Sequence, residues 1–216
     1  MKRFYLIIAF LTVGLVNVNA TIIEDVPAYN YTIGCGPTAA ASVLGYHLGW
    51  SMKSSEIRPE LDRIAQVFKS NNGWSFLNYS DDVFQDWGFN SYYERTNWDS
   101  VVASIDQGQP VLGLVDIGGD GRTDHFVSVF GYEFRDEKPW YAFYSGWSEA
   151  EVAQWEPFGL SQWNLMYSTF AIPGAEIIAE IGLAPEPGQA HPVPEPATIF
   201  LLGFGLIGLS KVIRKL

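Results

Sequence analysis

Cys35 and His125 are the residues of this chain whose types and placing could perform nucleophilic catalysis. Cys35 is the sole cysteine and directly precedes an Ala-rich segment, where the free N–H groups and dipole of a helix start would stabilise a thiolate. We therefore expect a thiol pKa below its ordinary value. His125 opens an apolar, β-branched run and can serve as the base, whereas His47 and His191 are interpreted as non-catalytic. A thiolate attacks a carbonyl carbon, and an imidazolium then protonates the leaving amine.

The elements that must position this pair follow from the hydrophobic pattern. Three segments have the apolar spacing or composition of helices, at residues 37–48, 54–70 and 97–107. Three later segments are β-branched and aromatic and are separated by turn-forming residues, at 111–115, 126–134 and 140–144. Because helices precede strands, the sequence predicts an α+β fold in which an N-terminal helical half packs on a C-terminal antiparallel β-sheet.

The loop before His125 has two interpretations. Asp116 and Asp120 occupy the first and fifth places of a calcium-binding loop and Gly121 the sixth, but the third-position acid and the closing Glu are missing. A Gly-rich hairpin loop that delivers His125 explains the same residues. We favour the hairpin, assign no cofactor and no metal, and leave calcium binding open.

Both ends of the chain have the patterns of processing signals. Residues 1–20 begin with two basic residues, continue through an apolar run and end in small residues, so we expect a signal peptide and a mature start at Thr21. An uncleaved anchor is the alternative, but the run is shorter than the roughly 20 residues that span a bilayer. Residues 21–175 form the expected domain and 176–192 a Pro-rich linker. An apolar stretch with a basic end follows in 193–216.

Composition limits the classes of partner. The formal net charge is −11, and the folded part is more acidic still because Lys and Arg gather at both ends. Nucleic acid is therefore not expected as a partner. One cysteine allows no intramolecular disulfide, which is unusual for an exported domain.

The tail resembles the PEP-CTERM sorting signal. Pro194, Glu195 and Pro196 precede the apolar stretch, and Lys211, Arg214 and Lys215 follow it. The resemblance implies recognition by an exosortase-type membrane enzyme and transient anchoring in the inner membrane through a short transmembrane helix. Removal of the tail would then leave the protein at the cell surface or outside the cell.

The domain resembles papain-like cysteine peptidases, most closely the bacteriocin-leader-processing branch and its secreted stand-alone relatives. The segments that carry the resemblance are 26–27, 35–38, 45–46, 108–111 and 125–132. It implies a papain-like α+β fold and a peptide or protein substrate. It also assigns Cys35 as nucleophile and His125 as general base and then acid.

Two positions depart from the pattern of this family. A glutamine about six residues before the cysteine commonly completes the oxyanion hole, and here Tyr29, Asn30 or Tyr31 could donate; Asn30 is preferred as the nearest chemical substitute. The residue that orients the histidine should lie near 144–147, where Ser145 is the aligned candidate. A serine cannot stabilise an imidazolium as a carboxylate does. By this reasoning an Asp or Asn at position 145 should raise activity.

Three functions fit these residues. The leading hypothesis is an exported cysteine peptidase. A non-catalytic relative could use the same cleft to bind a peptide or a surface polymer, and a thiol acyl transferase would use the same Cys and His geometry.

Overall fold

The fold is described by a computed structural model over residues 20–69, 75–160 and 162–174, all within the first compact unit of the chain, Met1–Ile181. The helices are α1 (Cys35–Leu48), α2 (Arg58–Val67), the short 3-10 helix η1 (Leu77–Tyr79), α3 (Ser80–Asp86) and α4 (Trp98–Asp106). The strands are β1 (Thr21–Ile22), β2 (Phe89–Arg95), β3 (Val111–Asp116), β4 (His125–Arg135), β5 (Lys138–Tyr144), β6 (Gln154–Pro157) and β7 (Asn164–Pro173). The predicted signal peptide, apart from Ala20, and the linker and sorting tail lie outside the described residues.

The strands form one antiparallel sheet in the order β2-β7-β3-β4-β5-β6, and β1 pairs with β4. Strand β3 is central, because β7 pairs with one of its edges and β4 with the other. In the β3–β4 register Val115 lies opposite His125. The histidine is thus fixed at the first residue of a well-paired strand.

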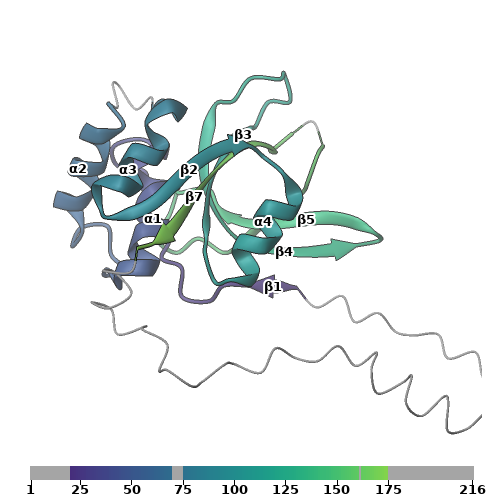
Figure 1. Ribbon diagram of the computed structural model, residues 1–216, viewed down its shortest axis with the longest axis horizontal. Coiled ribbons are helices and arrows are strands. Elements are labelled where there is room, and N and C mark those ends of the chain that lie inside the picture. The colour runs from purple at the N-terminus through teal and green to yellow at the C-terminus, as the bar shows by residue number, and fades with distance from the viewer. Residues whose placement is uncertain (1–19, 70–74, 161, 175–216) are drawn as a thin grey trace, which may run out of the picture. The chain divides into compact units, whose positions relative to one another are not determined.

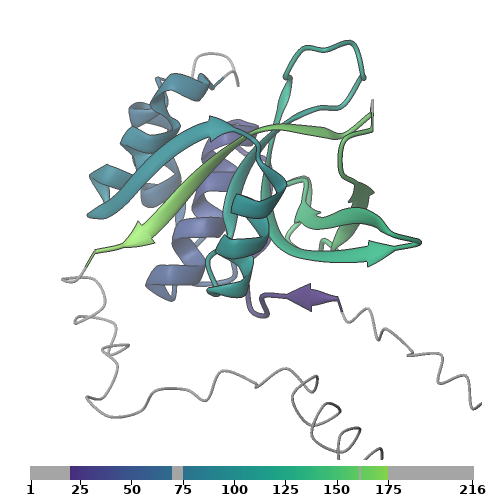
Figure 2. The ribbon, with the colours of Figure 1, turned by 45° about the vertical axis from the view of Figure 1, so that its right-hand side comes forward.

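Helices cover both faces of this sheet, and the two views of the ribbon show α1, α2 and α3 gathered on one side of it (Figures 1 and 2). Leu112 and Leu114 of β3 pack into the core beneath these helices. Val111 and Val115 pack on the other side, in a second core that includes residues of α4. Because both faces are covered, β3 is a continuous apolar run rather than an alternating one.

The predicted α+β class is confirmed, with differences in detail. The helix expected at 54–70 is shorter, since α2 begins at Arg58 with Pro59 in its first turn. The helix expected at 97–107 is α4, and Asn97 caps it by accepting a hydrogen bond from the Asp99 N–H. The helical half is not purely helical, because β2 lies within it and pairs with β7. Across the described residues, no helix is both long and apolar enough to cross a membrane.

Close packing under α1 explains Gly45, in the last turn of that helix. A Cβ at this position would lie 2.7 Å from the Tyr29 hydroxyl and 3.0 Å from the Pro27 ring. The fully buried Tyr29 donates its hydroxyl to the Ser51 carbonyl at 2.7 Å. Gly45 therefore lets the segment that leads to Cys35 lie directly against the helix that begins there.

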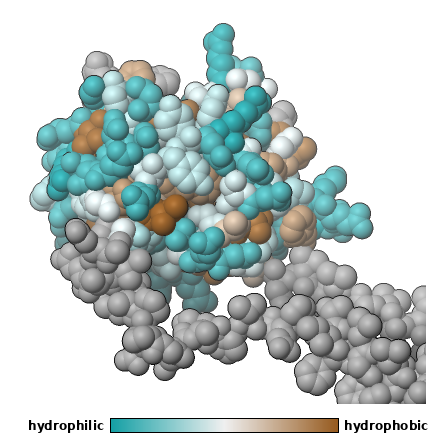
Figure 3. Space-filling view, in the orientation of Figure 1, coloured by the Kyte–Doolittle hydropathy of each residue, from teal (hydrophilic) through white to brown (hydrophobic). Residues whose placement is uncertain are grey.

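The face of the domain shown in Figure 3 is mostly hydrophilic, with small separate hydrophobic patches. Large hydrophobic side chains that remain exposed are scattered over several elements. Two of them, Tyr31 and Trp147, are 47% and 57% exposed. Both interact with the residues singled out from the sequence, as described below.

His47 lies inside the domain on α1, between the rings of Tyr46 and Phe89. Among the described residues no group hydrogen-bonds its Nε2. Burial lowers the pKa of His47 from 6.5 to about 4. These surroundings agree with its interpretation as a non-catalytic histidine.

The buried His47 should make the domain sensitive to acid. Its folded-state pKa lies below the unfolded value, so below pH 6.5 the unfolded chain binds the proton first and stability falls until about pH 4. Between pH 7 and pH 4 the parent should lose up to about 3 kcal/mol more unfolding free energy than His47→Gln. Urea unfolding at the two pH values measures this; equal losses would contradict the assignment.

Candidate active site

Cys35 is the first residue of α1 and is only 8% exposed. Gly34 precedes it with φ 129°, and the Thr38 hydroxyl donates to the Gly34 carbonyl at 2.8 Å. The main chain of Phe126, the residue directly after His125, lies close enough to the sulfur to lower the pKa of the thiol, as do the main-chain groups of Gly36 and Cys35 itself. The structure therefore places the start of β4, where His125 lies, near Cys35, although the two residues are far apart along the chain.

The expectation of a low thiol pKa is wrong for the resting site. Burial is the largest effect and raises the pKa of Cys35 above its ordinary value, and the negative charge of Asp124 raises it further. The main-chain groups of Cys35 and Gly36 lower the pKa, as expected for a helix start, and so does that of Phe126 on β4, but together they do not outweigh burial. The thiol is therefore protonated at neutral pH and needs a base.

His125 is 6% exposed and is held through one ring nitrogen. Its Nε2 lies 2.8 Å from the main-chain oxygen of Ser145, at the end of β5. A carbonyl oxygen only accepts, so Nε2 carries the proton and the neutral ring keeps its lone pair on Nδ1. Burial lowers the pKa of His125, while the hydrogen bond to Ser145 and the charges of Asp124 and Glu151 raise it. The ring is thus a neutral base at neutral pH.

Ser145 contacts His125 with its main chain rather than its side chain. Its hydroxyl donates to the Glu151 carboxylate, and its N–H donates to the same carboxylate at 2.8 Å. The next residue, Gly146, has φ 78°, and a Cβ there would lie 3.0 Å from the Thr38 side chain. Glycine at this position therefore lets the turn lie against α1 and direct the Ser145 carbonyl at the ring.

Two indole rings flank His125. The Trp147 ring centroid is 5.5 Å from that of the histidine, and the Trp163 centroid is 6.1 Å away in an edge-on arrangement. The two indoles also contact each other at 5.9 Å. They shield the ring and its hydrogen bond while leaving Trp147 accessible to a ligand.

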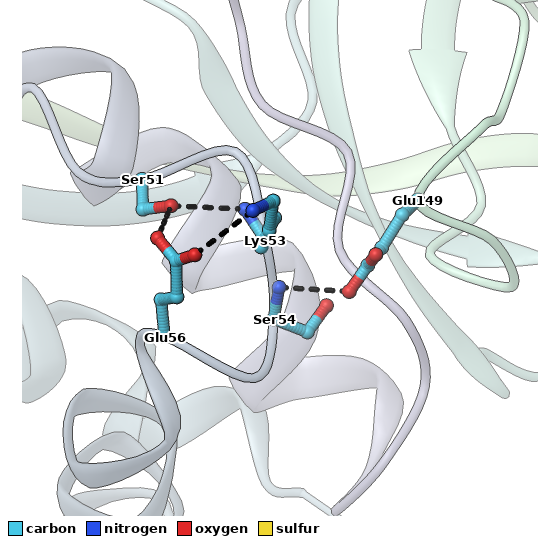
Figure 4. A network of polar contacts seen from close by, with 5 residues as sticks. All are labelled: Ser51, Lys53, Ser54, Glu56 and Glu149. Atoms are coloured by element: carbon cyan, nitrogen blue, oxygen red, sulfur yellow. Dashed lines mark hydrogen bonds and ion pairs between the residues drawn. The ribbon is translucent and has the colours of Figure 1, made fainter.

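Asn30 belongs to a closed ring of three hydrogen bonds, here called the rim clasp (Asn30, Ser54 and Glu149). The N–H of Asn30 donates to the Ser54 hydroxyl at 2.8 Å, and the N–H of Ser54 donates to the Glu149 carboxylate at 2.8 Å. The N–H of Glu149 donates to the Asn30 side-chain oxygen at 2.9 Å, which closes the ring. Figure 4 shows Ser54 facing Glu149 beside a separate network of Ser51, Lys53 and Glu56. The clasp joins three loops.

The rim clasp borders a cavity of about 390 Å³ that does not include the cysteine or the histidine. Its lining residues are Asn30, Thr32, Ser54, Ser55, Arg58 and Glu149. Of the two tyrosines beside Asn30, Tyr29 is buried in the core, whereas the pKa of the exposed Tyr31 is raised by burial of its inner part and by the charge of Cys35. Tyr31 is thus within electrostatic reach of the sulfur.

The loop before His125 is organised by Asp116 as a hairpin. The buried Asp116 carboxylate accepts from the N–H groups of Gly119 at 2.6 Å, Asp120 at 3.3 Å and Gly121 at 2.6 Å. Asp124 accepts from the Ile117 N–H at 3.0 Å. Asp116 is therefore occupied by its own loop, and no group of three or more metal-binding side chains occurs within the described ranges.

Sequence reasoning did not single out Glu151. This carboxylate lies six residues beyond Ser145 and receives hydrogen bonds from four groups, described below. The available signal was an acidic residue shortly after the turn that should orient the histidine. Its geometry depends on how the loop between β5 and β6 folds back, which no local pattern predicts.

A cysteine at the start of a buried helix and a histidine at the start of an inner antiparallel strand agree with a papain-like peptidase fold. Residues 23–168 match the model described as "Peptidase_C39 like family". The match spans more than half of the chain, which therefore belongs to this family. Residues 192–215 match the PEP-CTERM protein-sorting motif. Both resemblances seen in the sequence are confirmed.

Among solved structures, two peptidases are similar to this chain. The peptidase domain of Streptococcus ComA, a bifunctional ABC transporter of a quorum-sensing pathway, is 18% identical, with 69% of this chain and 97% of that chain covered and a TM-score of 0.47. A C39-like peptidase from Bacillus anthracis is 11% identical, with 70% and 97% covered and a TM-score of 0.48. A search of curated protein sequences finds no match.

Proposed function

We propose that this protein is an exported cysteine peptidase that hydrolyses peptide bonds with Cys35 as nucleophile and His125 as base. One arrangement carries the proposal: Cys35 at the start of α1 lies near the main chain of Phe126, the neighbour of His125, while the far nitrogen of the ring is held by the Ser145 carbonyl. This arrangement leaves the lone pair of Nδ1 available to the thiol. Family membership supports the same chemistry.

The reaction begins from a neutral thiol and a neutral imidazole. As the sulfur attacks the substrate carbonyl carbon, Nδ1 takes the thiol proton, and a C–S bond forms. The imidazolium then gives this proton to the leaving amine as the C–N bond breaks, which leaves a thioester on Cys35. Water, deprotonated by the same Nδ1, hydrolyses the thioester and restores both groups. The Ser145 carbonyl stabilises the ring whenever it is charged.

The oxyanion that forms during attack needs two donors, for which we propose the Cys35 N–H and the Asn30 side chain. The Asn30 side-chain oxygen already accepts from the Glu149 N–H, which leaves its NH₂ group as the donating end. Tyr31, which interacts electrostatically with Cys35, is the alternative donor on this rim.

The sorting motif supports the proposed location. A PEP-CTERM tail implies recognition by an exosortase-type enzyme, with brief anchoring in the inner membrane by the C-terminal apolar helix. After removal of the tail, the peptidase would act at the cell surface or outside the cell. We propose peptides or proteins encountered there as substrates.

Product analysis separates hydrolysis from acyl transfer and from simple binding. The mature domain is incubated with a mixed peptide library, with and without a primary amine acceptor, and products are identified by mass spectrometry. We expect free carboxyl products that persist when the amine is present, and none with Cys35→Ala. Amine-linked products would favour an acyl transferase. Bound but uncut peptide would favour the binding module.

A further inference from the structure

Glu151 lies behind the histidine, on the far side of the peptide group that joins Ser145 to Gly146. The carbonyl of this peptide accepts from His125 Nε2 at 2.8 Å, and its N–H donates to Glu151 Oε2 at 2.9 Å. Ring, peptide and carboxylate thus form one continuous hydrogen-bonded chain. Each link polarises the next in the same direction, toward more negative charge at the carbonyl oxygen that faces the ring.

The carboxylate is fixed by further donors. Its other oxygen accepts from the Ser145 N–H and hydroxyl and from the Gln154 side chain, the last at 2.7 Å. Gln154 also donates to the Ser145 hydroxyl at 3.1 Å. Four donors hold the half-buried Glu151 carboxylate in one orientation, so its negative charge has a fixed position relative to the His125 ring.

We propose that Glu151 is a positioning residue for His125, which supplies through the Ser145–Gly146 peptide the negative charge that a direct Asp partner supplies in a Cys-His-Asp triad. This inference rests on the proposed peptidase function. A charge from Glu151 would compensate for Ser145 at the position of the orienting residue, since a serine alone offers no charge to an imidazolium.

Few charged groups surround the ring. On its own strand side Asp124 also raises the pKa of His125 through its charge, but its carboxylate accepts a hydrogen bond from the Ile117 N–H. Cys35, on the α1 side, lies near the main chain of Phe126 and is neutral at rest. Trp147 and Trp163 contribute no charge. Glu151 is therefore the anion connected to His125 by hydrogen bonds.

Glu151→Gln tests the proposal with little change in size. Its amide NH₂ cannot accept from the Gly146 N–H when its oxygen keeps the bonds to Ser145, so charge and relay are lost together. We expect kcat to fall on the order of tenfold with KM nearly unchanged. Because the charge of Glu151 raises the pKa of His125, its loss should move the acid limb of the kcat/KM profile to lower pH.

Two further variants complete the test. Glu156→Gln removes a carboxylate from β6 and should leave both the limb and kcat unchanged. Glu151→Asp keeps the charge and should recover the limb and at least a third of the parental kcat, which also tests the proposal if Glu151→Gln does not fold. The positioning role would be overturned if folded Glu151→Gln kept the acid limb of the parent. It would also be overturned if Glu151→Asp lost as much kcat as Glu151→Gln.

An NMR titration of the His125 ring in parent and Glu151→Gln separates this proposal from the peptidase assignment. Long-range ¹H–¹⁵N spectra report the ring tautomer and its pKa without any substrate. A lower His125 pKa in the variant supports the positioning role even if no peptide is cut. An unchanged pKa and tautomer overturn that role even if the parent proves to be an active peptidase.

Discussion

Replacing His125 with Ala should reduce kcat/KM for peptide hydrolysis by roughly 10²- to 10⁴-fold, the range that positioned acid–base groups contribute. The reason lies in the burial of Cys35, which raises the thiol pKa and leaves the sulfur protonated at neutral pH. Without Nδ1 nothing on the strand takes the thiol proton, and nothing returns a proton to the leaving amine. Steady-state kinetics on a peptide found by the product analysis measure the loss.

His47→Gln is the matched control for this experiment, because it removes a second buried histidine from the same domain. At pH 7 its hydrolysis rate should stay within about twofold of the parent, since His47 packs against Phe89 rather than in the site. Equal losses in the two variants would show that activity follows stability alone. A His125→Ala variant with parental activity would remove His125 from the mechanism.

Local sequence patterns predicted best those residues at which a helix or a strand begins. Cys35 precedes an Ala-rich helix, and His125 begins an apolar strand, so both positions could be predicted from neighbours in the chain. The start of α4 next to Asn97 could be predicted for the same reason. Strand β2 was not, because it is mostly exposed and is stabilised by pairing with the distant β7.

The thiol pKa could not be predicted from sequence because it reflects a balance between near and far effects. A helix start lowers it locally, but burial against β4 is a property of the folded domain and is the larger effect. The role of Ser145 likewise depends on contacts that form only in the folded domain. Its hydroxyl contacts Glu151, so an Asp at position 145 would place two carboxylates together, and the substitution should now lower activity rather than raise it.

The second large effect concerns the reactivity of Cys35 toward iodoacetamide. When a neutral base lies beside a neutral thiol, a small fraction exists as thiolate and imidazolium, and this fraction does not change between the two pKa values. The parent should therefore label at a nearly constant rate from about pH 6.5 to 8. His125→Ala lacks this ion pair, so its labelling should follow thiol ionisation alone and fall about tenfold for each pH unit below the thiol pKa.

The rate of Cys35 alkylation against pH, in the parent and in His125→Ala, tests most directly whether the histidine activates the cysteine. Adducts are counted by intact mass, which is unambiguous because the chain has one cysteine. We expect a flat profile for the parent near neutral pH and a sloping one for His125→Ala, whose labelling should be at least tenfold slower at pH 6.5. Two sloping profiles that coincide would contradict it.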